Sequence, residues 1–282
     1  MQTVIGLGQA GCNIADQLAQ YPQYQVLKID VGLRKTKKTL GFKLQSSPED
    51  YEKKPLPRGT EKFLEGVMPE TLLITSCGAV SGAALRLLEK IHKKTKISVM
   101  YIIPKYENLS HFQFHQNNLL FNVFQEYARS SAIERVFLVD NQKTSDIMGP
   151  VPILKYWESL NYMISSTYHM INVFDHSHPV FTTFTRRYPT ARVTSFGCID
   201  FENNEEKCFF KLDMPREKRY YYAIPQKMLE EDVSLMEKIQ INMKEAVEHD
   251  KMKVSYSVYS SEYDIPYVYC ENSSTLVQKL AF

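Results

Sequence analysis

The chain has 282 residues, of which 44% are hydrophobic and 23% are charged, and its net charge is only +2. These values are ordinary for a folded globular protein, and so small a charge argues against broad nucleic-acid binding. No apolar run reaches the roughly 18 residues of a membrane helix, and the first residues lack the features of a signal peptide. The five cysteines are widely spaced, without a CxxC pair. We therefore expect a soluble cytoplasmic protein with reduced thiols, no disulfide framework, no metal site, and no membrane or nucleic-acid partner.

In chain order, the first half alternates between strand and helix patterns. Strands are expected at residues 2–7, 25–30, 71–75, 97–103 and 135–139. Helices are expected at 12–20, 83–93 and 109–128, the last with an apolar face of Leu109, Phe112, Leu119, Val123 and Tyr127. The lysine-rich stretch 34–62 is broken by Pro48, Pro55, Pro57 and Gly59, which predicts an irregular surface segment. The alternation predicts a parallel sheet covered on both faces.

The second half has a different texture. A long helix is expected from Pro152 to Phe174, with one apolar face of Trp157, Leu160, Ile164, Tyr168 and Ile171. Short strands follow at 191–201, 207–212 and 218–224, and residues Tyr220 to Tyr222 are expected to alternate between core and surface. One amphipathic helix is expected over 225–249, and strands at 253–259 and 266–271 are candidates to pair with each other. We expect an α/β domain over residues 1–150, a central core helix over 151–174 and a smaller α+β domain over 175–282.

A glycine-rich loop stands between the first strand and the first helix. Residues Gly6 to Gly11 match GxGxxG, in which glycines permit a tight turn and the helix N-terminus offers free N–H groups to a phosphate. In a dinucleotide-binding fold an acidic residue follows about 20 positions later to bind the ribose, and Asp30 fits that demand. The loop alone predicts a phosphate site. It leaves open a nicotinamide-dependent Rossmann enzyme, or a glycine turn without a ligand.

A second glycine loop, Cys77 to Gly82, follows the strand at 71–75. Together with Gly8-Gln9-Ala10-Gly11-Cys12-Asn13, it resembles the two phosphate loops of the tubulin/FtsZ superfamily, which read GxGxxGxN and GGGTGTG. Further landmarks follow in the family's order. Glu107 lies in a segment similar to PFxFE, and Asn141 lies in one similar to the IPN turn. The helix after Pro152 corresponds to the family's core helix, so the resemblance covers most of the chain.

The resemblance implies a Rossmann-like GTPase domain at residues 1–150 and an activation and assembly domain at 175–282. It implies that GTP or GDP, with Mg²⁺, is bound by Gly8, Gln9, Ala10, Gly11, Asn13, Gly78, Ala79, Val80, Ser81, Gly82, Glu107, Asn141, Tyr156 and Asn161. It also implies head-to-tail self-assembly into filaments, with hydrolysis where two subunits meet, and a possible accessory or cargo protein. The residues implied to complete the neighbour's site are Asn172, Asp175 and His178.

Two departures from the family pattern bear on activity. Ala79 and Val80 replace the threonine and glycine of the second loop, and a valine disfavours positive φ and would fill space near the phosphate. His178 stands where the family has a second acid. We therefore expect altered nucleotide binding and a weak GTPase activated by self-assembly; the alternative is a structural protein of the same fold that has lost turnover. The ending Leu280-Ala281-Phe282, without linker or acidic tail, favours a compact plasmid- or phage-type relative, or a specialised paralogue, over the division protein of the family.

Overall fold

The computed structural model describes residues 1–280, apart from the side chain of Asn108. The chain end on which the expectation of a compact relative rests includes Ala281 and Phe282, which lie outside the described residues. The described chain forms two compact units, residues 1–166 with Lys279 and Leu280, and residues 167–278. The helix α7 (Tyr156–Asp175) contains the division. The expected three-part division stays a prediction. Within residues 1–280, no helix combines the length and apolarity that crossing a membrane requires.

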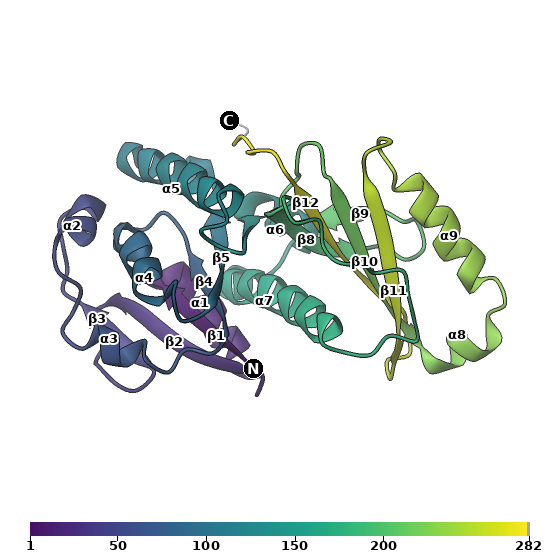
Figure 1. Cartoon of the computed structure of the whole chain (residues 1–282), viewed down its shortest axis with the longest axis horizontal. Helices are drawn as coiled ribbons and strands as arrows, with labels where there is room; N and C mark the ends of the chain where they lie inside the picture. The colour runs from purple at the N-terminus through teal and green to yellow at the C-terminus, as the bar shows by residue number, and fades with distance from the viewer. Residues whose placement is uncertain (281–282) are drawn as a thin grey trace. The chain divides into compact units, whose positions relative to one another are not determined.

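The first unit is built on a parallel sheet in the order β3-β2-β1-β4-β5-β6 (Figure 1). The strands are β1 (Gln2–Leu7), β2 (Tyr24–Val31), β3 (Thr39–Phe42), β4 (Glu70–Thr75), β5 (Lys96–Ile103) and β6 (Arg135–Asp140). From β1 the chain proceeds in one direction to β2 and β3, and from β4 in the other to β5 and β6. The expected mixed α/β class with a parallel sheet is confirmed.

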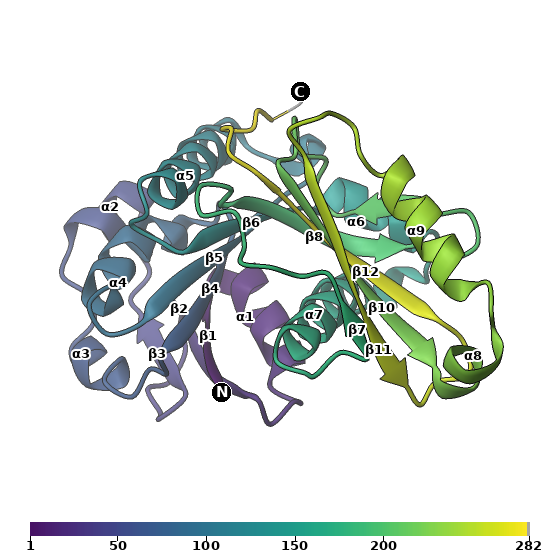
Figure 2. The same ribbon diagram turned by 45° about the vertical axis from the view of Figure 1, so that its right-hand side comes forward.

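Helices cover both faces of this sheet. The helix α1 (Gly8–Leu18) lies on one face, and α4 (Ala84–Ile91) and α5 (His111–Arg129) lie on the other (Figure 2). Right-handed crossovers require this placement when the connections from β1 and β4 run in opposite directions. The remaining helical segments are α2 (Pro48–Lys53), α3 (Thr60–Phe63), α6 (Asn141–Met148), and the 3₁₀ turns η1 (Ala79–Ala83), η2 (Tyr106–Asn108) and η3 (Ile153–Lys155).

Two expectations for this unit are wrong. The stretch 34–62 is not irregular, since it contains β3, α2 and α3, and Tyr51 of α2 is buried. The apolar face expected for α5 is also displaced, because Phe112 and Leu119 are 45% and 57% exposed. The buried face of α5 includes polar side chains instead, among them Asn117, whose Oδ1 accepts a 2.8 Å hydrogen bond from the Tyr101 hydroxyl. Burial of such groups is tolerated when they are hydrogen-bonded.

The second unit has a mixed sheet in the order β8-β12-β10-β11-β7, with β9 on β8. Its strands are β7 (Phe181–Thr182), β8 (Val193–Ile199), β9 (Glu206–Cys208), β10 (Glu217–Pro225), β11 (Lys253–Ser261) and β12 (Tyr267–Ser274). The expected pairing of the last two strands is wrong, because β10 lies between them, parallel to β11 and antiparallel to β12. Every residue of β10 is buried, which suits a central strand.

The tyrosine run at the centre of β10 is buried on both faces of this sheet. Tyr220 and Tyr222 belong to a cluster with Leu235 and Ile239 of α9 (Leu235–Glu245). Tyr221 points to the opposite face, where its ring stacks on Phe174 of α7 at 6.3 Å. The expected alternation between core and surface is therefore wrong, because both faces are covered.

The single helix expected over 225–249 is wrong as well. It is divided into α8 (Gln226–Glu231) and α9, with a break at residues 232–234. The Asp232 carboxylate accepts hydrogen bonds from the Ser234 N–H at 2.9 Å and from its hydroxyl at 2.6 Å. Such local side-chain bonds compete with helix continuation. Val233, expected on the apolar stripe, is fully exposed in this break.

Candidate functional site

A cavity of about 580 Å³ opens at the carboxyl ends of the parallel strands in the first unit. Its lining follows four of them: Leu7 and Gly8 at the end of β1, Ser76 to Gly78 after β4, Pro104 and Lys105 after β5, and Asn141 after β6. The adjacent strands β1 and β4 are the point at which the chain reverses its direction across the sheet. Ligands of open α/β sheets bind at this point.

The first glycine loop forms one wall of the cavity. The helix α1 begins at Gly8, whose φ of +74° favours glycine, and its first turn has neither a side-chain cap nor an acidic residue. The first N–H groups of α1 are thus available to an anion. Gly11 does not line the cavity but lets α1 approach β4, because a Cβ there would lie 2.1 Å from the Ile74 carbonyl oxygen.

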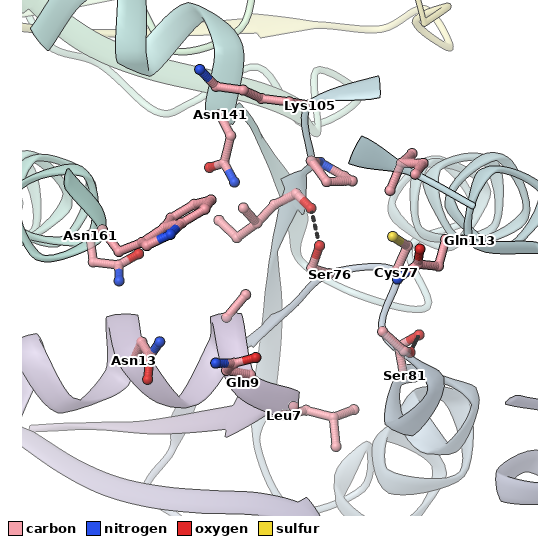
Figure 3. A pocket seen from close by; sticks show the side chains of 17 residues that line it. Leu7, Gln9, Asn13, Ser76, Cys77, Ser81, Lys105, Gln113, Asn141 and Asn161 are labelled. Atoms are coloured by element: carbon pink, nitrogen blue, oxygen red, sulfur yellow. Dashed lines mark hydrogen bonds between the residues drawn. The ribbon is translucent and has the colours of Figure 1, made fainter. Parts of the chain in front are cut away.

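The second glycine loop forms the opposite wall. Ser76, Cys77, Gly78 and Ser81 line the cavity there, and Figure 3 shows the side chains of Ser76, Cys77 and Ser81 across from Asn13 and Asn161. The Ser81 hydroxyl donates to the Gly78 carbonyl at 2.5 Å, which closes the turn. Burial raises the pKa of the Cys77 thiol to about 11, so this thiol is neutral near pH 7.

The expectation that Val80 fills space near the phosphate is wrong. Its side chain is buried, it does not line the cavity, and its φ is not among the positive values found in residues 1–280. It therefore neither strains the loop nor fills the cavity. Gly82 serves packing rather than the cavity, because a Cβ there would lie 2.0 Å from the Pro48 carbonyl oxygen.

Three asparagines, Asn13, Asn141 and Asn161, lie along one side of the cavity (Figure 3). Asn141 is 8% exposed, and its Oδ1 has no hydrogen-bond partner within residues 1–280. Leaving a buried amide oxygen unpaired costs about 1–3 kcal/mol, so a ligand N–H is the natural partner. Asp140 fixes the start of α6 by accepting hydrogen bonds from the N–H groups of Gln142 and Lys143 at 2.7 and 3.3 Å.

Lys105 is the only charged residue among the lining residues of this described cavity. Its Nζ donates to the Ser145 hydroxyl at 3.3 Å and lies 5.3 Å from the centre of the Tyr156 ring. Tyr156 does not line the cavity, and its buried hydroxyl has no hydrogen-bond partner within the described chain. The ammonium group is thus held by Ser145 and Tyr156, neither of which lines the cavity.

The structure thus brings together part of the expected binding set. Eight of the expected residues line the cavity: Gly8, Gln9, Ala10, Asn13, Gly78, Ser81, Asn141 and Asn161. Six do not: Gly11, Ala79, Val80, Gly82, Glu107 and Tyr156. The sequence analysis missed Ser76, Lys105, Gln113 and Trp157. Ser76 and Lys105 each follow a strand that was correctly expected, so the rule that sites form at carboxyl ends of parallel strands was the signal that could have found them.

The three residues expected to act in catalysis lie in the second unit, and none lines the cavity. Asp175 ends α7, forms an ion pair with Arg187, and accepts a 2.9 Å hydrogen bond from the Tyr221 hydroxyl. The Asn172 carbonyl bonds the ring Nδ1 of His176 at 2.8 Å. His178 is exposed.

Comparison with known proteins gives matches at the level of structure. No protein-family model and no curated protein matches the sequence. A GTPγS-form protofilament of TubZ from Bacillus thuringiensis serovar israelensis matches with a TM-score of 0.74 and 15% identity, over 99% of this chain and 89% of that one. The M. jannaschii FtsZ dimer matches with a TM-score of 0.69 and 11% identity, over 96% and 87%. The chain has a tubulin/FtsZ-like fold. GTPγS-bound CetZ2 from Haloferax volcanii, at a TM-score of 0.70 and 11% identity over 97% and 92%, has this fold too.

The tubulin/FtsZ-like fold confirms the resemblance stated from the two glycine loops. Identities of 11% and 15% establish the fold alone, so what the chain binds has to be argued from the cavity itself.

Proposed function

We propose that this chain binds a guanine nucleotide in the cavity of its first unit and assembles head to tail into filaments. The observation that carries the proposal is the cavity at the strand-order reversal, with free helix N–H groups on one wall and amide side chains along one side. Its volume of about 580 Å³ lies within the range of sites for small molecules and cofactors.

The phosphate end of the nucleotide would lie between the two glycine loops. The first turn of α1 offers uncapped N–H groups, and the second loop adds the hydroxyls of Ser76 and Ser81, which would turn to a phosphate from the Ile102 and Gly78 carbonyls to which they donate. Both are ordinary partners of phosphate oxygens. Lys105 is the one cation among the described lining residues, and its charge near the cavity favours an anionic ligand.

The base would lie at the asparagines. Guanine presents N–H donors at N1 and its 2-amino group, and the unpaired Oδ1 of Asn141 is an acceptor for such a donor. Adenine has an acceptor at N1 and no 2-amino group, so the same position would leave Asn141 unpaired. Trp157 lines the cavity near the start of α7 and can stack on a base.

The competing hypothesis, a nicotinamide-dependent Rossmann enzyme, rested on Asp30 as the ribose ligand. Asp30, the expected ribose ligand, does not line the cavity, and its carboxylate accepts a 2.8 Å hydrogen bond from the N–H of Val31. Among the lining residues that the structure describes there is no carboxylate, so Mg²⁺ would be held by the nucleotide phosphates and water rather than by an acidic side chain.

Head-to-tail assembly is the second part of the proposal. TubZ structures similar to this chain are described as protofilaments and as two-stranded and four-stranded filaments. We propose that Asn172, Asp175 and His178 of one subunit lie at the nucleotide of the next. We further propose that the filaments form in the cytoplasm and bind an accessory or cargo protein. The six expected binding residues that do not line the cavity would support the nucleotide from outside the lining: Gly11, Ala79, Val80, Gly82, Glu107 and Tyr156.

Binding is tested by isothermal titration of the full chain with GTP, ATP and NAD⁺. GTP should bind and the other two should bind at least tenfold more weakly. Asn141→Leu should weaken GTP binding about tenfold, by the loss of a buried hydrogen bond. The matched control is Asn122→Ala on the exposed side of α5. Equal affinity for ATP, or no GTP binding, contradicts the proposal.

One observation favours a second candidate, a filament protein without turnover. The Asp175 carboxylate is already paired with Arg187 and Tyr221 within its own chain, which reduces its freedom to orient a water elsewhere. Phosphate release measured across a range of protein concentrations separates the two. A hydrolysing filament shows a rate per subunit that rises with assembly, whereas the second candidate binds and assembles with no release at any concentration.

A further inference from the structure

Two cysteines and a glutamate that are far apart in sequence meet in the second unit. The Sγ atoms of Cys208 and Cys270 lie 3.4 Å apart, and a carboxylate oxygen of Glu206 lies within 4.8 Å of both. Cys270 is completely buried, and the other two residues are partly buried. This cluster is independent of the nucleotide cavity, which lies in the first unit.

Gly197 brings the two thiols together. In the sheet, Cys208 of β9 and Cys270 of β12 are both register partners of Gly197, on the strand between them. A Cβ at Gly197 would lie 2.1 Å from the Lys207 carbonyl oxygen and 2.7 Å from the Cα of Cys208. Because glycine has no side chain, β9 can close on β8, and the cysteine side chains can meet across it.

The surroundings of the cluster hold its side chains in place. Oε1 of Glu206 accepts hydrogen bonds from Tyr220 and, at 2.9 Å, from Lys218. Oε2 accepts one at 3.0 Å from Nδ2 of Asn272, which also lies 3.3 Å from the Cys208 sulfur. Partners of this kind orient the ligands of metal sites.

We propose that Cys208, Cys270 and Glu206 form a binding site for a thiophilic divalent cation of the Zn²⁺ class. Two thiol protons leave to solvent as two sulfur–metal bonds form, and Oε2 of Glu206 is the third ligand, which leaves a fourth position for water. Tetrahedral Zn²⁺ with bonds of about 2.3 Å places two sulfurs about 3.8 Å apart, so a shift of a few tenths of an ångström suffices.

The charge at this site favours a cation. Two thiolates and the Glu206 carboxylate carry three negative charges, and the Lys218 ammonium, which Glu206 shares with Glu248, offsets only part of them. A disulfide is the competing use of the two thiols. It would require the sulfurs to approach by roughly a further 1.3 Å, to the usual bond length of about 2.05 Å.

The test is titration of the reduced, full-length protein with Co²⁺, followed by absorbance. We expect one Co²⁺ per chain, with sulfur-to-metal charge-transfer bands in the near ultraviolet that added Zn²⁺ removes. This experiment needs no variant. Cys208→Ser and Cys270→Ser should each weaken binding at least tenfold, whereas Cys198→Ser, on the neighbouring position of β8, should leave it unchanged.

Glu206→Gln is a further variant, since it retains both thiols and should keep the charge-transfer bands while weakening binding. Absence of stoichiometric binding and of charge-transfer bands in the wild type overturns the proposal. So does binding that persists in both cysteine variants, or a Cys208–Cys270 disulfide that forms in the metal-free protein and is unaffected by excess Zn²⁺.

Discussion

Arg187 forms an ion pair with Asp175, the residue that ends α7. The other terminal nitrogen of the same guanidinium pairs with Glu271 of β12, whose side chain is 3% exposed. Burial opposes the charge of Arg187, but the carboxylates of Glu271 and Asp175 raise its pKa above the ordinary value, so it stays charged. Asp175 therefore has a structural role within its own chain, separate from the catalytic role proposed for it.

Replacement of Asp175 separates these two roles. If the proposed function holds, Asp175→Ala abolishes assembly-dependent phosphate release and leaves GTP affinity unchanged, because the binding cavity lies in the other unit. Phosphate release and titration calorimetry on the same preparation measure both quantities. Glu231→Ala, an exposed acid at the end of α8, serves as control. Undiminished turnover in Asp175→Ala would refute a catalytic role for this carboxylate.

Loss of Arg187 should destabilise the second unit. Arg187→Gln removes a cation from two carboxylates, one of them buried, and we expect the free energy of unfolding to fall by about 3 kcal/mol. Arg129→Gln removes an exposed ion pair with Glu126 and should cost less than about 0.5 kcal/mol. Urea unfolding followed by fluorescence measures both; equal midpoints would show that the buried network contributes little.

Two glycines near the cavity should respond oppositely to alanine. Gly11→Ala places a Cβ 2.1 Å from the Ile74 carbonyl oxygen, so we expect a loss of about 2–3 kcal/mol and weaker nucleotide binding as α1 moves. At Gly78 the φ is −62° and nothing lies within 4 Å of the added carbon. Gly78→Ala should therefore leave stability unchanged or raise it by up to about 1 kcal/mol. Thermal unfolding of the two variants measures both changes in stability. Similar losses of stability in both would contradict the different roles assigned to Gly11 and Gly78.

Glu217 should make the stability of the second unit depend on acid pH. Burial alone would raise its pKa, but the N–H of Tyr188 and the cations Lys253 and Arg219 outweigh burial and lower the pKa below the ordinary 4.5. A lowered pKa in the folded state contributes stability that is complete above pH 4.5 and is lost as the pH falls through the folded value.

The corresponding measurement is unfolding free energy against pH for the wild type and Glu217→Gln. Glu217→Gln should be less stable than the wild type at pH 7 and should lose less unfolding free energy than the wild type on acidification. The exposed Glu230→Gln should follow the wild-type curve. A wild-type curve that is flat below pH 4.5 would mean that these contacts do not favour the ionised carboxylate.

The sequence predicted the first unit well because its signals are local. Each strand of the parallel sheet except β3 was expected from an apolar run, and the first glycine loop marked the cavity wall. Two expectations failed there: the stretch 34–62 contains β3, α2 and α3 instead of irregular chain, and the expected apolar face of α5 is not the buried one. Its buried polar residues, such as Asn117 with Tyr101, depend on partners that no helical pattern contains.

The second unit was harder to predict because its determinants are distant in sequence. The position of β10 between β11 and β12 is set by pairing, and the approach of Cys208 to Cys270 depends on a glycine in a third strand. The expectation of no metal site rested on the lack of a CxxC pair, a local criterion that cannot detect this cluster. Likewise, the contact of Asp175 with Arg187 follows from tertiary packing alone.

Negative-stain electron microscopy of the full chain tests the central claim most directly. Samples over a range of protein concentrations should be compared with GTP, with a non-hydrolysable GTP analogue, with ATP, and without nucleotide. The account predicts filaments with GTP and its analogue, and none with ATP or without nucleotide. Absence of filaments at every concentration in GTP, together with no bound guanine nucleotide in the same sample, would contradict it.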